Sequence, residues 1–561
     1  MRLTAAFAAV LLTPTLAVPL RAREPYHARH AMVTGQEPIA TRAGVAMLKK
    51  DGNAVDAAVT VGFALAVTYP FAGNLGGGGF MLIHMADGRS TFIDFREMAP
   101  HAASRNMYLD SAGNLTKGSL VGWRASGVPG SVAGFALAME KYGTKKWADV
   151  VAPAEKLARR GIPVSYALSE SLRRSQELLS QFPDSNRIFL NNGALREPGT
   201  VFKQPGLART LKRIRKNGAK DFYHGETARL IDAAMRANGG DITLDDLANY
   251  RAIERKPLTG SYRGYTVLTS PPPSSGGVGI LEMLGMLEGS HYTQSGAGSA
   301  AAIHYVAEVE RRAYADRNEY LADPDFHRAP IAQLLDPGYL HARAATILAN
   351  HATPSTEIGP GKLAALLHES SDTTHFNVID SAGNAVAVTY TLNGGYGSGV
   401  TVPGAGFLLN NEMDDFAAKP GAPNMFGLVQ GEANGIQPGK RPLSSMTPTM
   451  LLKDGKPFLV LGAPGGSRIV NGVFEVMLNV VDFHMNVQDA IDWPRFHHQW
   501  LPDTLFLEPG ISPDTARLLE AMGYKLGQVS GVARVEAIVN TGTWLEGGTD
   551  GRAPGGLAAG Y

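Results

Sequence analysis

The chain of 561 residues contains no cysteine. Thiol catalysis, disulfide scaffolds and thiolate-held zinc or iron–sulfur sites are therefore excluded. An excess of charge is lacking too, because 52 Lys and Arg residues balance 51 Asp and Glu residues to a net charge of +1. Such a balance produces no bulk field that would draw the protein to nucleic acid or to an anionic membrane, so small or neutral partners are favoured and nucleic acid is not expected.

Long apolar runs are absent from the body of the chain. The longest candidate extends from Ala54 to Val67, contains Asp56 and stops before Pro70. This run is short for a bilayer span, whereas Asn53 followed by Asp56 resembles a capping box at a helix start. The pattern predicts a buried helix in an ordinary globular protein, whose 44% of hydrophobic residues suffices for a large core.

The amino terminus has the pattern of an export signal. Met1 and Arg2 give a positive start, and an apolar stretch follows with small residues suitable for cleavage near Ala17 and Ala22. We predict a signal peptide over residues 1–22 and an exported mature protein, periplasmic or fully secreted, with no stable membrane span. An uncleaved N-terminal anchor is the alternative.

Helical spacing dominates the middle of the chain, over residues 131–240 and 300–350. Between these regions, Ser270–Gly277 is rich in proline, serine and glycine and predicts a rigid loop. Earlier in the chain, the extended runs Phe80–His84 and Ser90–Arg96 flank an Asp-Gly turn signal and predict a hairpin. Strands and helices together indicate a layered α/β or α+β fold.

A boundary is predicted near residue 372, where short alternating strands and glycine-rich turns begin. The strand that starts at Thr373 is followed by the turn Ser381–Asn384 and a second strand. If this turn forms the whole loop, Thr391 faces Thr374 and lies beside Thr373. Threonines at a strand start are most often plain strand residues, so a catalytic role needs further support.

Other catalytic motifs are missing from the sequence. There is no Gly-x-Ser-x-Gly or His-Glu-x-x-His, and Gly76–Gly79 lacks the Gly-Lys-Ser/Thr ending of a phosphate-binding loop. His497 and His498 could ligate a metal, but neighbouring residues of an extended chain point to opposite faces and no third ligand is near. A structural role is favoured for both, and no metal site is expected.

Several separated motifs resemble those of the γ-glutamyltranspeptidase family, in the family's order and over nearly the whole mature chain. They are Gly73–Phe80, Asp94–Glu97, Ala313–Arg317, Thr373–His375, Asn410–Phe416, Arg441–Met446, Pro464–Arg468 and Pro494–His498. The resemblance implies an α+β fold, the four-layer αββα sandwich of N-terminal nucleophile hydrolases. It also implies a precursor that cuts itself into a large and a small subunit, which interleave in one structure.

By this resemblance, cleavage falls between Asp372 and Thr373, giving a large subunit of residues 23–372 and a small subunit of residues 373–561. The chemistry suits threonine, because its hydroxyl is a poor nucleophile without a base. Cleavage would free the α-amine of Thr373, whose pKa of about 7.7–8.0 fits that role. No cofactor is needed for these steps.

The activity implied is that of a γ-glutamyltransferase and glutathione hydrolase. Thr373 would form an acyl-enzyme from glutathione or another γ-glutamyl compound and pass the acyl group to water or to an acceptor amino acid or peptide. The resemblance assigns Thr391 to support of the Thr373 hydroxyl. It assigns the backbone N–H groups of Gly465 and Gly466 to the oxyanion, a role for which glycine permits the unusual dihedral angles.

The donor's α-carboxylate and α-ammonium require a pocket with a cation at one end and acids at the other. The matching positions for the carboxylate are Arg96, Ser444 and Ser445, and those for the ammonium are Asn393, Glu412 and Asp415. Asp415 also argues against glutaryl acylases, because a glutaryl group has no ammonium to pair with a buried acid.

The segment Lys419–Lys440 is similar to the lid of bacterial family members, many of which carry a tyrosine where this chain has Phe426. The substitution keeps an aromatic cover but removes a hydroxyl that could tie the lid to Asn393, so easier opening is expected.

Two other interpretations remain open. One keeps the fold and the nucleophile but makes another amide the substrate, such as a β-lactam side chain or poly-γ-glutamate. The other is a periplasmic binding protein for amino acids or peptides that never cleaves itself. The presence of Thr373, Thr391, Gly465 and Gly466 together disfavours the second.

Overall fold

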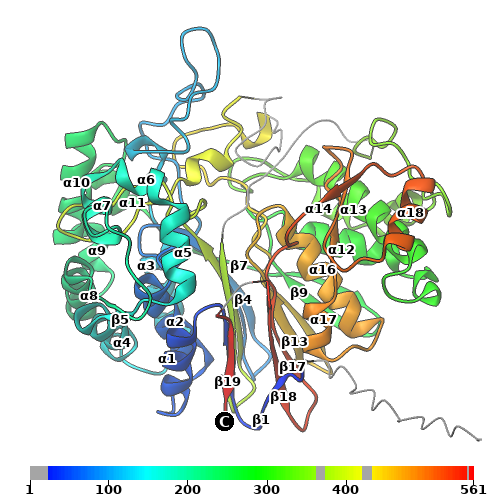
Figure 1. The fold of residues 1–561 in the computed structure, drawn as a ribbon, viewed down its shortest axis with the longest axis horizontal. Helices are drawn as coiled ribbons and strands as arrows, with labels where there is room; N and C mark the ends of the chain where they lie inside the picture. Colours follow the sequence, from blue (N-terminus) through cyan, green and yellow to red (C-terminus); the bar gives the residue numbers. More distant parts are fainter. Residues whose placement is uncertain (1–22, 362–372, 420–431, 553–554) are drawn as a thin grey trace, which may run out of the picture.

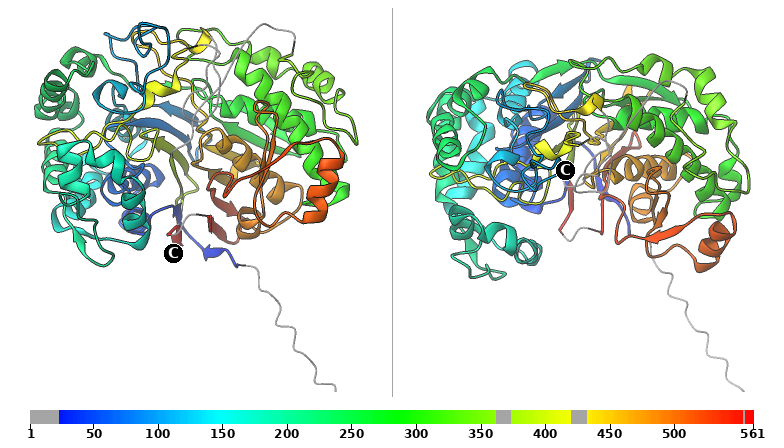
Figure 2. Two further views of the ribbon diagram at one scale, coloured as in Figure 1. Left: turned by 45° about the horizontal axis from the view of Figure 1, so that its top comes forward. Right: turned by 90° about the horizontal axis from the view of Figure 1, so that it is seen from above.

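The structure is a computed structural model that describes residues 23–361, 373–419, 432–552 and 555–561. Within these residues, two seven-stranded sheets occupy the centre, with helices α1–α11 outside one sheet and α12–α18 outside the other (Figure 1). Figure 2 shows the same division from two further directions. The result is a helix–sheet–sheet–helix sandwich, as predicted.

The first sheet has the order β19 (Leu557–Gly560), β2 (Met32–Gly35), β10 (Thr374–Ile379), β11 (Ala385–Thr391), β3 (Gly78–His84), β4 (Ser90–Asp94) and β7 (Ile253–Arg255). The second has the order β1 (Tyr26–Ala28), β18 (Leu545–Thr549), β17 (Glu536–Asn540), β13 (Lys456–Gly462), β12 (Thr449–Lys453), β9 (Tyr265–Thr269) and β8 (Leu258–Tyr262). Smaller sheets join β14 (Phe496–His497), β15 (Leu505–Leu507) and β16 (Leu526–Gln528), and β5 (Ile162–Pro163) with β6 (Val201–Phe202).

The helices outside the first sheet are α1 (Pro38–Leu48), α2 (Ala54–Thr68), α3 (Ser131–Tyr142), α4 (Trp147–Arg160), α5 (Tyr166–Arg174), α6 (Gln176–Ser180), α7 (Pro183–Phe189), α8 (Pro205–Asn217), α9 (Lys220–His224), α10 (Glu226–Asn238) and α11 (Leu244–Asn249). Those outside the second are α12 (Gly276–Leu287), α13 (Ala300–Tyr320), α14 (Ile331–Leu334), α15 (Pro337–Ala344), α16 (Arg468–Val481), α17 (Val487–Asp492) and α18 (Pro513–Ala521). Short 3-10 turns are η1 (Trp123–Ala125), η2 (Tyr292–Ser295), η3 (Glu412–Asp415) and η4 (Glu432–Asn434).

Helix α2 confirms the buried helix predicted from the sequence. The Asn53 side chain accepts hydrogen bonds from the first turn, and Asp56 accepts from the Asn53 N–H (2.8 Å), which completes the capping box. Every residue of α2 is buried. On its sheet-facing side, the Tyr390 hydroxyl donates to the Gly62 carbonyl (3.0 Å) and ties the helix to β11.

Strand β11 lies between the two halves of the core. Its Val386, Val388 and Tyr390 side chains pack with the helices outside the first sheet, whereas Ala385 and Ala387 face the second sheet. This alternation follows the two-residue period of a strand. Small alanines on the inner face let the two sheets pack closely.

The predicted hairpin register is wrong by one residue. Thr374 pairs with Tyr390, and Ile379 pairs with Ala385. The turn is longer than predicted because the Asp380 carboxylate accepts from the N–H groups of Ala382 (2.9 Å) and Asn384 (3.0 Å) and removes Asp380 from the strand. Gly383, at φ +90°, completes this turn.

The strands that follow residue 373 are central in the first sheet. Strand β10 pairs with β2, and β11 pairs with β3, so the sequences before and after the predicted cleavage point share one sheet. The interleaved arrangement implied by the resemblance is present. Sheet pairing therefore holds the two segments together whether or not the chain is cut between them.

Helix α12 and strands β7–β9 were not predicted, and α12 begins inside the segment expected to be a loop. A Cβ at Gly276 would lie 1.8 Å from the Thr447 Oγ, and one at Gly277 would lie 2.0 Å from the Ser270 carbonyl oxygen. Glycine is needed here for close packing at a helix start, which the sequence pattern alone does not separate from a loop.

Candidate active site

Thr373 precedes β10, and Thr391 ends β11 on the neighbouring strand. Extending the observed register by one residue places the two threonines opposite each other. Both are buried. The Asn393 N–H donates to the Thr391 Oγ (2.8 Å) and orients that hydroxyl. The expectation that Thr391 lies beside Thr373 is met, although the register used to reach it was wrong.

A buried pocket gathers eight of the predicted site residues. Its lining consists of Arg96, Thr373, Thr391, Asn393, Glu412, Asp415, Ser444 and Ser445, together with Met446 and Ile469. These residues come from the start of β10 and the end of β11 with the residues next to them, the segment after β4, the turn η3, the segment before β12 and the first turn of α16. The topology thus collects two hydroxyl pairs, Thr373 with Thr391 and Ser444 with Ser445, together with one cation and two acids around one small pocket.

Arg96 is the centre of charge in this pocket. It is 1% exposed, and its guanidinium forms ion pairs with Glu412 and Asp415. Its Nη1 lies 3.8 Å from the Glu97 carboxylate, and its Nη2 donates to the backbone carbonyl of Leu443 (3.2 Å). Cation and acids therefore form one cluster, instead of the two separate ends expected from the sequence.

Burial raises the pKa of Glu97 to about 7 and that of Glu412 well above its usual range, despite the opposing effect of Arg96. Three carboxyl groups around one guanidinium cannot all ionise at low cost in a dry site. The cluster therefore holds at least part of its acid in the protonated form at neutral pH.

Asn393 adopts a left-handed backbone conformation with φ +71°. Asparagine tolerates this region better than most residues. Its Nδ2 donates to the Asn411 carbonyl (3.1 Å), and the Asn411 Oδ1 accepts from the Gly394 N–H (2.8 Å). Asn411 thus fixes the chain just after Thr391, a role that the sequence did not reveal.

Ser444 and Ser445 are held by the segment that was predicted as a rigid loop. The Ser444 N–H donates to the Pro273 carbonyl (2.7 Å), and the Ser275 N–H donates to the Ser444 carbonyl (2.6 Å). The nearby Arg441 donates to the Arg96 carbonyl (2.6 Å). Arg441 and Glu97 lie in two of the segments that resemble the family's motifs, but the sequence did not predict that they lie beside Arg96.

Gly465 and Gly466 lie between β13 and α16, at φ +147° and +64°. Both values lie in the region that favours glycine, and a Cβ at Gly465 would lie 2.6 Å from the Ala533 Cα. Neither glycine lines the pocket itself. Ile469, whose N–H donates to the Gly466 carbonyl (2.9 Å), does line it, so the glycine turn is adjacent to the pocket.

Residues 40–560 match the family model described as Gamma-glutamyltranspeptidase. The chain belongs to the γ-glutamyltranspeptidase family. A glutathione hydrolase proenzyme of Escherichia coli (strain K12) is 51% identical over 96% of this chain and 93% of that protein. A solved cephalosporin acylase from Bacillus halodurans is 28% identical with a TM-score of 0.85, covering 98% of this chain and 99% of its own. A solved Helicobacter pylori γ-glutamyltranspeptidase is 42% identical with a TM-score of 0.58, covering 62% of this chain and 99% of its own.

These likenesses confirm the predicted family, fold and enzyme class. Asp372, Phe426 and most of the predicted lid lie outside the described residues, as do residues 1–22. Within the described ranges, no helix has the length and hydropathy needed to cross a bilayer.

The two adjacent histidines have protein partners. His497 contacts the side chains of Asn471 (3.0 Å) and Gln499 (2.8 Å) through its two ring nitrogens, and His498 accepts from the Trp500 N–H (3.1 Å). Burial lowers the pKa of His497 to about 3 and that of His498 to about 4, so both are neutral. These contacts support the structural role favoured from the sequence.

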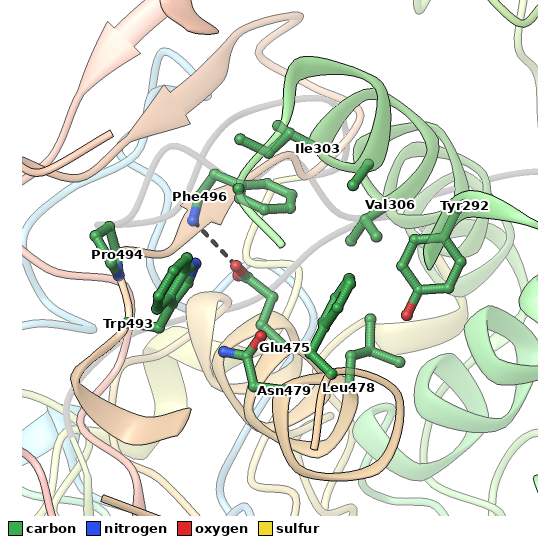
Figure 3. Close-up of a pocket in the computed structure, with 12 residues that line it drawn as sticks. Tyr292, Ile303, Val306, Glu475, Leu478, Asn479, Trp493, Pro494 and Phe496 are labelled. Atoms are coloured by element: carbon green, nitrogen blue, oxygen red, sulfur yellow. Dashed lines mark hydrogen bonds between the residues drawn. The ribbon is translucent and has the colours of Figure 1, made fainter. Parts of the chain in front are cut away.

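A second pocket lies between α13 and α16 and shares no lining residue with the first (Figure 3). Its walls include Ile303, Val306, Leu478 and Phe496. Glu475 is its acidic group and accepts from the Phe496 N–H (3.2 Å), the contact dashed in Figure 3. This pocket is largely apolar and contains none of the predicted site residues.

Glu97→Gln tests the charge balance of the cluster around Arg96. The folded pKa of Glu97, about 7, is higher than the usual 4.5, so its stabilising contribution is present below pH 4.5 and lost as pH rises toward 7. The variant lacks this loss, so its unfolding free energy relative to wild type should rise by about 1.4 kcal/mol per pH unit between about pH 5 and 7.

The measurement is chemical denaturation of both proteins across that pH range. Glu140→Gln, which removes an exposed carboxylate, is the matched control and should show no such trend. A difference for Glu97→Gln that does not change with pH would contradict the raised pKa.

Proposed function

We propose that this protein is an exported, self-processing γ-glutamyltransferase and glutathione hydrolase, with Thr373 as its nucleophile. Its precursor would comprise a signal peptide (1–22), a large subunit (23–372) and a small subunit (373–561). The observation that carries the proposal is the buried pocket that Thr373 lines together with Arg96 and its acidic partners. That pocket combines an acylation site with groups that match an α-amino acid.

The first reaction would be self-cleavage. The Thr373 hydroxyl attacks the Asp372 carbonyl, and the C–N bond breaks, which frees the α-amine of Thr373 and leaves an ester on its hydroxyl oxygen. Water then hydrolyses the ester to the Asp372 carboxylate and the free Thr373 hydroxyl. The freed α-amine then serves as the base for that hydroxyl. Thr391, opposite Thr373 and oriented by the Asn393 N–H, supports the hydroxyl.

Donor binding would use the charge cluster around Arg96. The α-carboxylate pairs with Arg96 and accepts from Ser444 and Ser445, while Glu412, Asp415 and Asn393 receive the α-ammonium. Arg96 is already paired with both acids in this structure. A zwitterion carries one charge of each sign. Its carboxylate can therefore pair with Arg96 and its ammonium with the acids, and no buried charge is left uncompensated.

Acyl transfer would follow at the γ-carbonyl. The Thr373 hydroxyl adds to it, the backbone N–H groups of Gly465 and Gly466 stabilise the oxyanion, and the amine leaves with a proton returned from the Thr373 amine. Water then releases glutamate, or an amino acid or peptide takes the γ-glutamyl group.

The likeness to a cephalosporin acylase makes another amide the second candidate substrate. The buried acids favour a γ-glutamyl amide over a glutaryl amide, because a glutaryl group carries no ammonium to pair with them. We expect kcat/KM for a γ-glutamyl anilide to exceed that for the glutaryl anilide by about 100-fold, the effect of one unmatched buried charge.

The same measurement extends to natural donors. Glutathione should be cleaved with a higher kcat/KM than a β-lactam side-chain amide or poly-γ-glutamate. A preference for either of the latter would make that amide the substrate of the same site. A protein that stays uncut and binds γ-glutamyl compounds without cleaving them would instead be a binding protein.

A further inference from the structure

The glycine turn Gly465–Gly466 depends on its neighbours for its direction. A glycine backbone moves more freely than that of any other residue, so the pair keeps one geometry only where the flanking residues are held. Within the described residues, neither of the two N–H groups has a protein acceptor, so both are available to a ligand. At the start of the turn, the Pro464 carbonyl accepts from the Arg534 N–H (3.0 Å). The other end is held at Ser467.

Two hydrogen bonds tie Ser467 to other parts of the fold. Its carbonyl accepts from the Tyr314 hydroxyl on α13, and its hydroxyl donates to the Gln499 Oε1 (2.9 Å). Ser467 follows the glycine turn directly and precedes the first residue of α16. The bond to Gln499 is therefore the side-chain contact that holds the end of the turn.

The orientation of the Gln499 amide follows from a backbone carbonyl. Its Nε2 donates to the Leu501 carbonyl (3.0 Å), so Oε1 is the atom that faces Ser467 and His497. An amide oxygen only accepts hydrogen bonds, and therefore the His497 Nε2, which lies 2.8 Å away, carries a proton. One oxygen atom thus accepts from both the serine hydroxyl and the histidine ring.

The second ring nitrogen of His497 agrees with this tautomer. The Asn471 Nδ2 donates to the His498 carbonyl (3.2 Å) and lies 3.0 Å from the His497 Nδ1, which is therefore an acceptor. Burial lowers the pKa of His497 to about 3, so the neutral ring persists at neutral pH. Asn471 lies on α16, one turn after Ser467. The contacts close a ring of side chains that consists of Ser467, Gln499, His497 and Asn471.

We propose that His497 and Gln499 are positioning residues, which set the direction of the N–H groups of the glycine turn through Ser467. The inference rests on the proposed function, because it concerns the oxyanion that those N–H groups would stabilise. Neither His497 nor Gln499 lines the pocket, so each acts only through the turn. The whole ring lies in the predicted small subunit and would stay together after cleavage.

A loosened turn should lower kcat and leave KM unchanged. Acylation and deacylation both pass through an oxyanion that the bound substrate lacks, so its donors stabilise the transition states alone. Removal of an oxyanion donor costs about 10²- to 10³-fold in kcat, and a donor that is only displaced should cost less, about tenfold. A merely structural role would lower Tm and leave kcat unchanged.

The test compares His497→Phe and His497→Gln with the matched control His304→Phe. Phenylalanine keeps the ring shape but removes both nitrogens, so the Gln499 amide loses a bond that orients it. Glutamine keeps an N–H donor at the end of the side chain and should restore most of the kcat. His304 is another buried histidine, whose ring nitrogens contact the Tyr524 hydroxyl (2.8 Å) and the Leu348 carbonyl (2.6 Å).

The kcat and KM for a γ-glutamyl anilide are measured per mole of small subunit, and Tm is measured by thermal unfolding. We expect His497→Phe to lower kcat about tenfold and to leave KM within about twofold of wild type. His304→Phe should lower Tm and keep the wild-type kcat. Wild-type kcat in His497→Phe, a rise in KM that accounts for the lost activity, or an equal fall in kcat in His304→Phe would overturn the positioning role.

Ser467→Ala tests the same link with a smaller change, the loss of one hydroxyl. It should also lower kcat about tenfold, and the double variant with His497→Phe should be no slower than the slower single variant, because both interrupt one chain of contacts. Additive losses, or a wild-type kcat in Ser467→Ala, would overturn the proposal even if His497→Phe fails to fold. A wild type that stays uncut or releases no aniline would instead overturn the proposed function.

Discussion

Thr373→Ala is expected to leave the protein as one uncut chain that does not hydrolyse a γ-glutamyl anilide. The substitution removes the hydroxyl on which both self-cleavage and acyl transfer depend in the proposed mechanism. Loss of a nucleophile costs about 10³-fold or more in rate, which places the residual activity near background. Denaturing gels show the first effect, and release of the aniline shows the second.

Two variants make this result specific. Thr373→Ser keeps a hydroxyl and should still cleave itself, with a small subunit that begins at the new serine. Thr374→Ala alters the next strand residue, whose side chain contacts Gln36 (3.3 Å) and does not line the pocket. It should mature and remain active.

N-terminal sequencing of the small subunit decides the site of the cut. The wild-type fragment should begin Thr-Thr-His, at Thr373. If Thr373→Ala gave the same fragment, another nucleophile or an outside protease would be responsible. A wild-type fragment that begins elsewhere would move the nucleophile away from the pocket.

Local signals in the sequence predicted local structure well. The capping box at Asn53 marked the start of α2, and the Asp-Gly turn marked the hairpin of β3 and β4. The β10–β11 hairpin was predicted, but its register was not, because the side-chain hydrogen bonds of Asp380 set the turn length. Side-chain bonds of this kind do not follow from a period-two pattern.

Long-range features of the site could not be predicted from spacing. Arg96 pairs with Glu412 and Asp415 although more than 300 positions separate them, and β10 joins β2 across a similar distance. The resemblance to a family supplied the residue types, and the structure then placed eight of them in one pocket. The direct pairing of Arg96 with both acids arises from tertiary packing. Packing brings together charged residues that are far apart in the sequence and share no local motif.

Asp415→Asn is expected to lower kcat/KM for a γ-glutamyl anilide by about 10²-fold, which removes its advantage over the glutaryl anilide, and the value for the glutaryl anilide should not fall. Asparagine keeps the shape of the side chain but removes the charge that would face the donor ammonium, and loss of one partner from a buried charged pair is costly. Arg96 keeps its contact with Glu412, so the guanidinium stays held in place.

The ratio of the two kcat/KM values separates recognition from damage to the fold. Asp414→Asn is the matched control, because Asp414 is an adjacent buried acid that accepts from the Ser119 hydroxyl (2.6 Å) and does not line the pocket. Its ratio should match that of wild type. A proportional fall for both anilides in Asp415→Asn would indicate a structural role for Asp415. An unchanged ratio at full activity would show that the ammonium is bound elsewhere, since the two substrates differ only in the α-ammonium group.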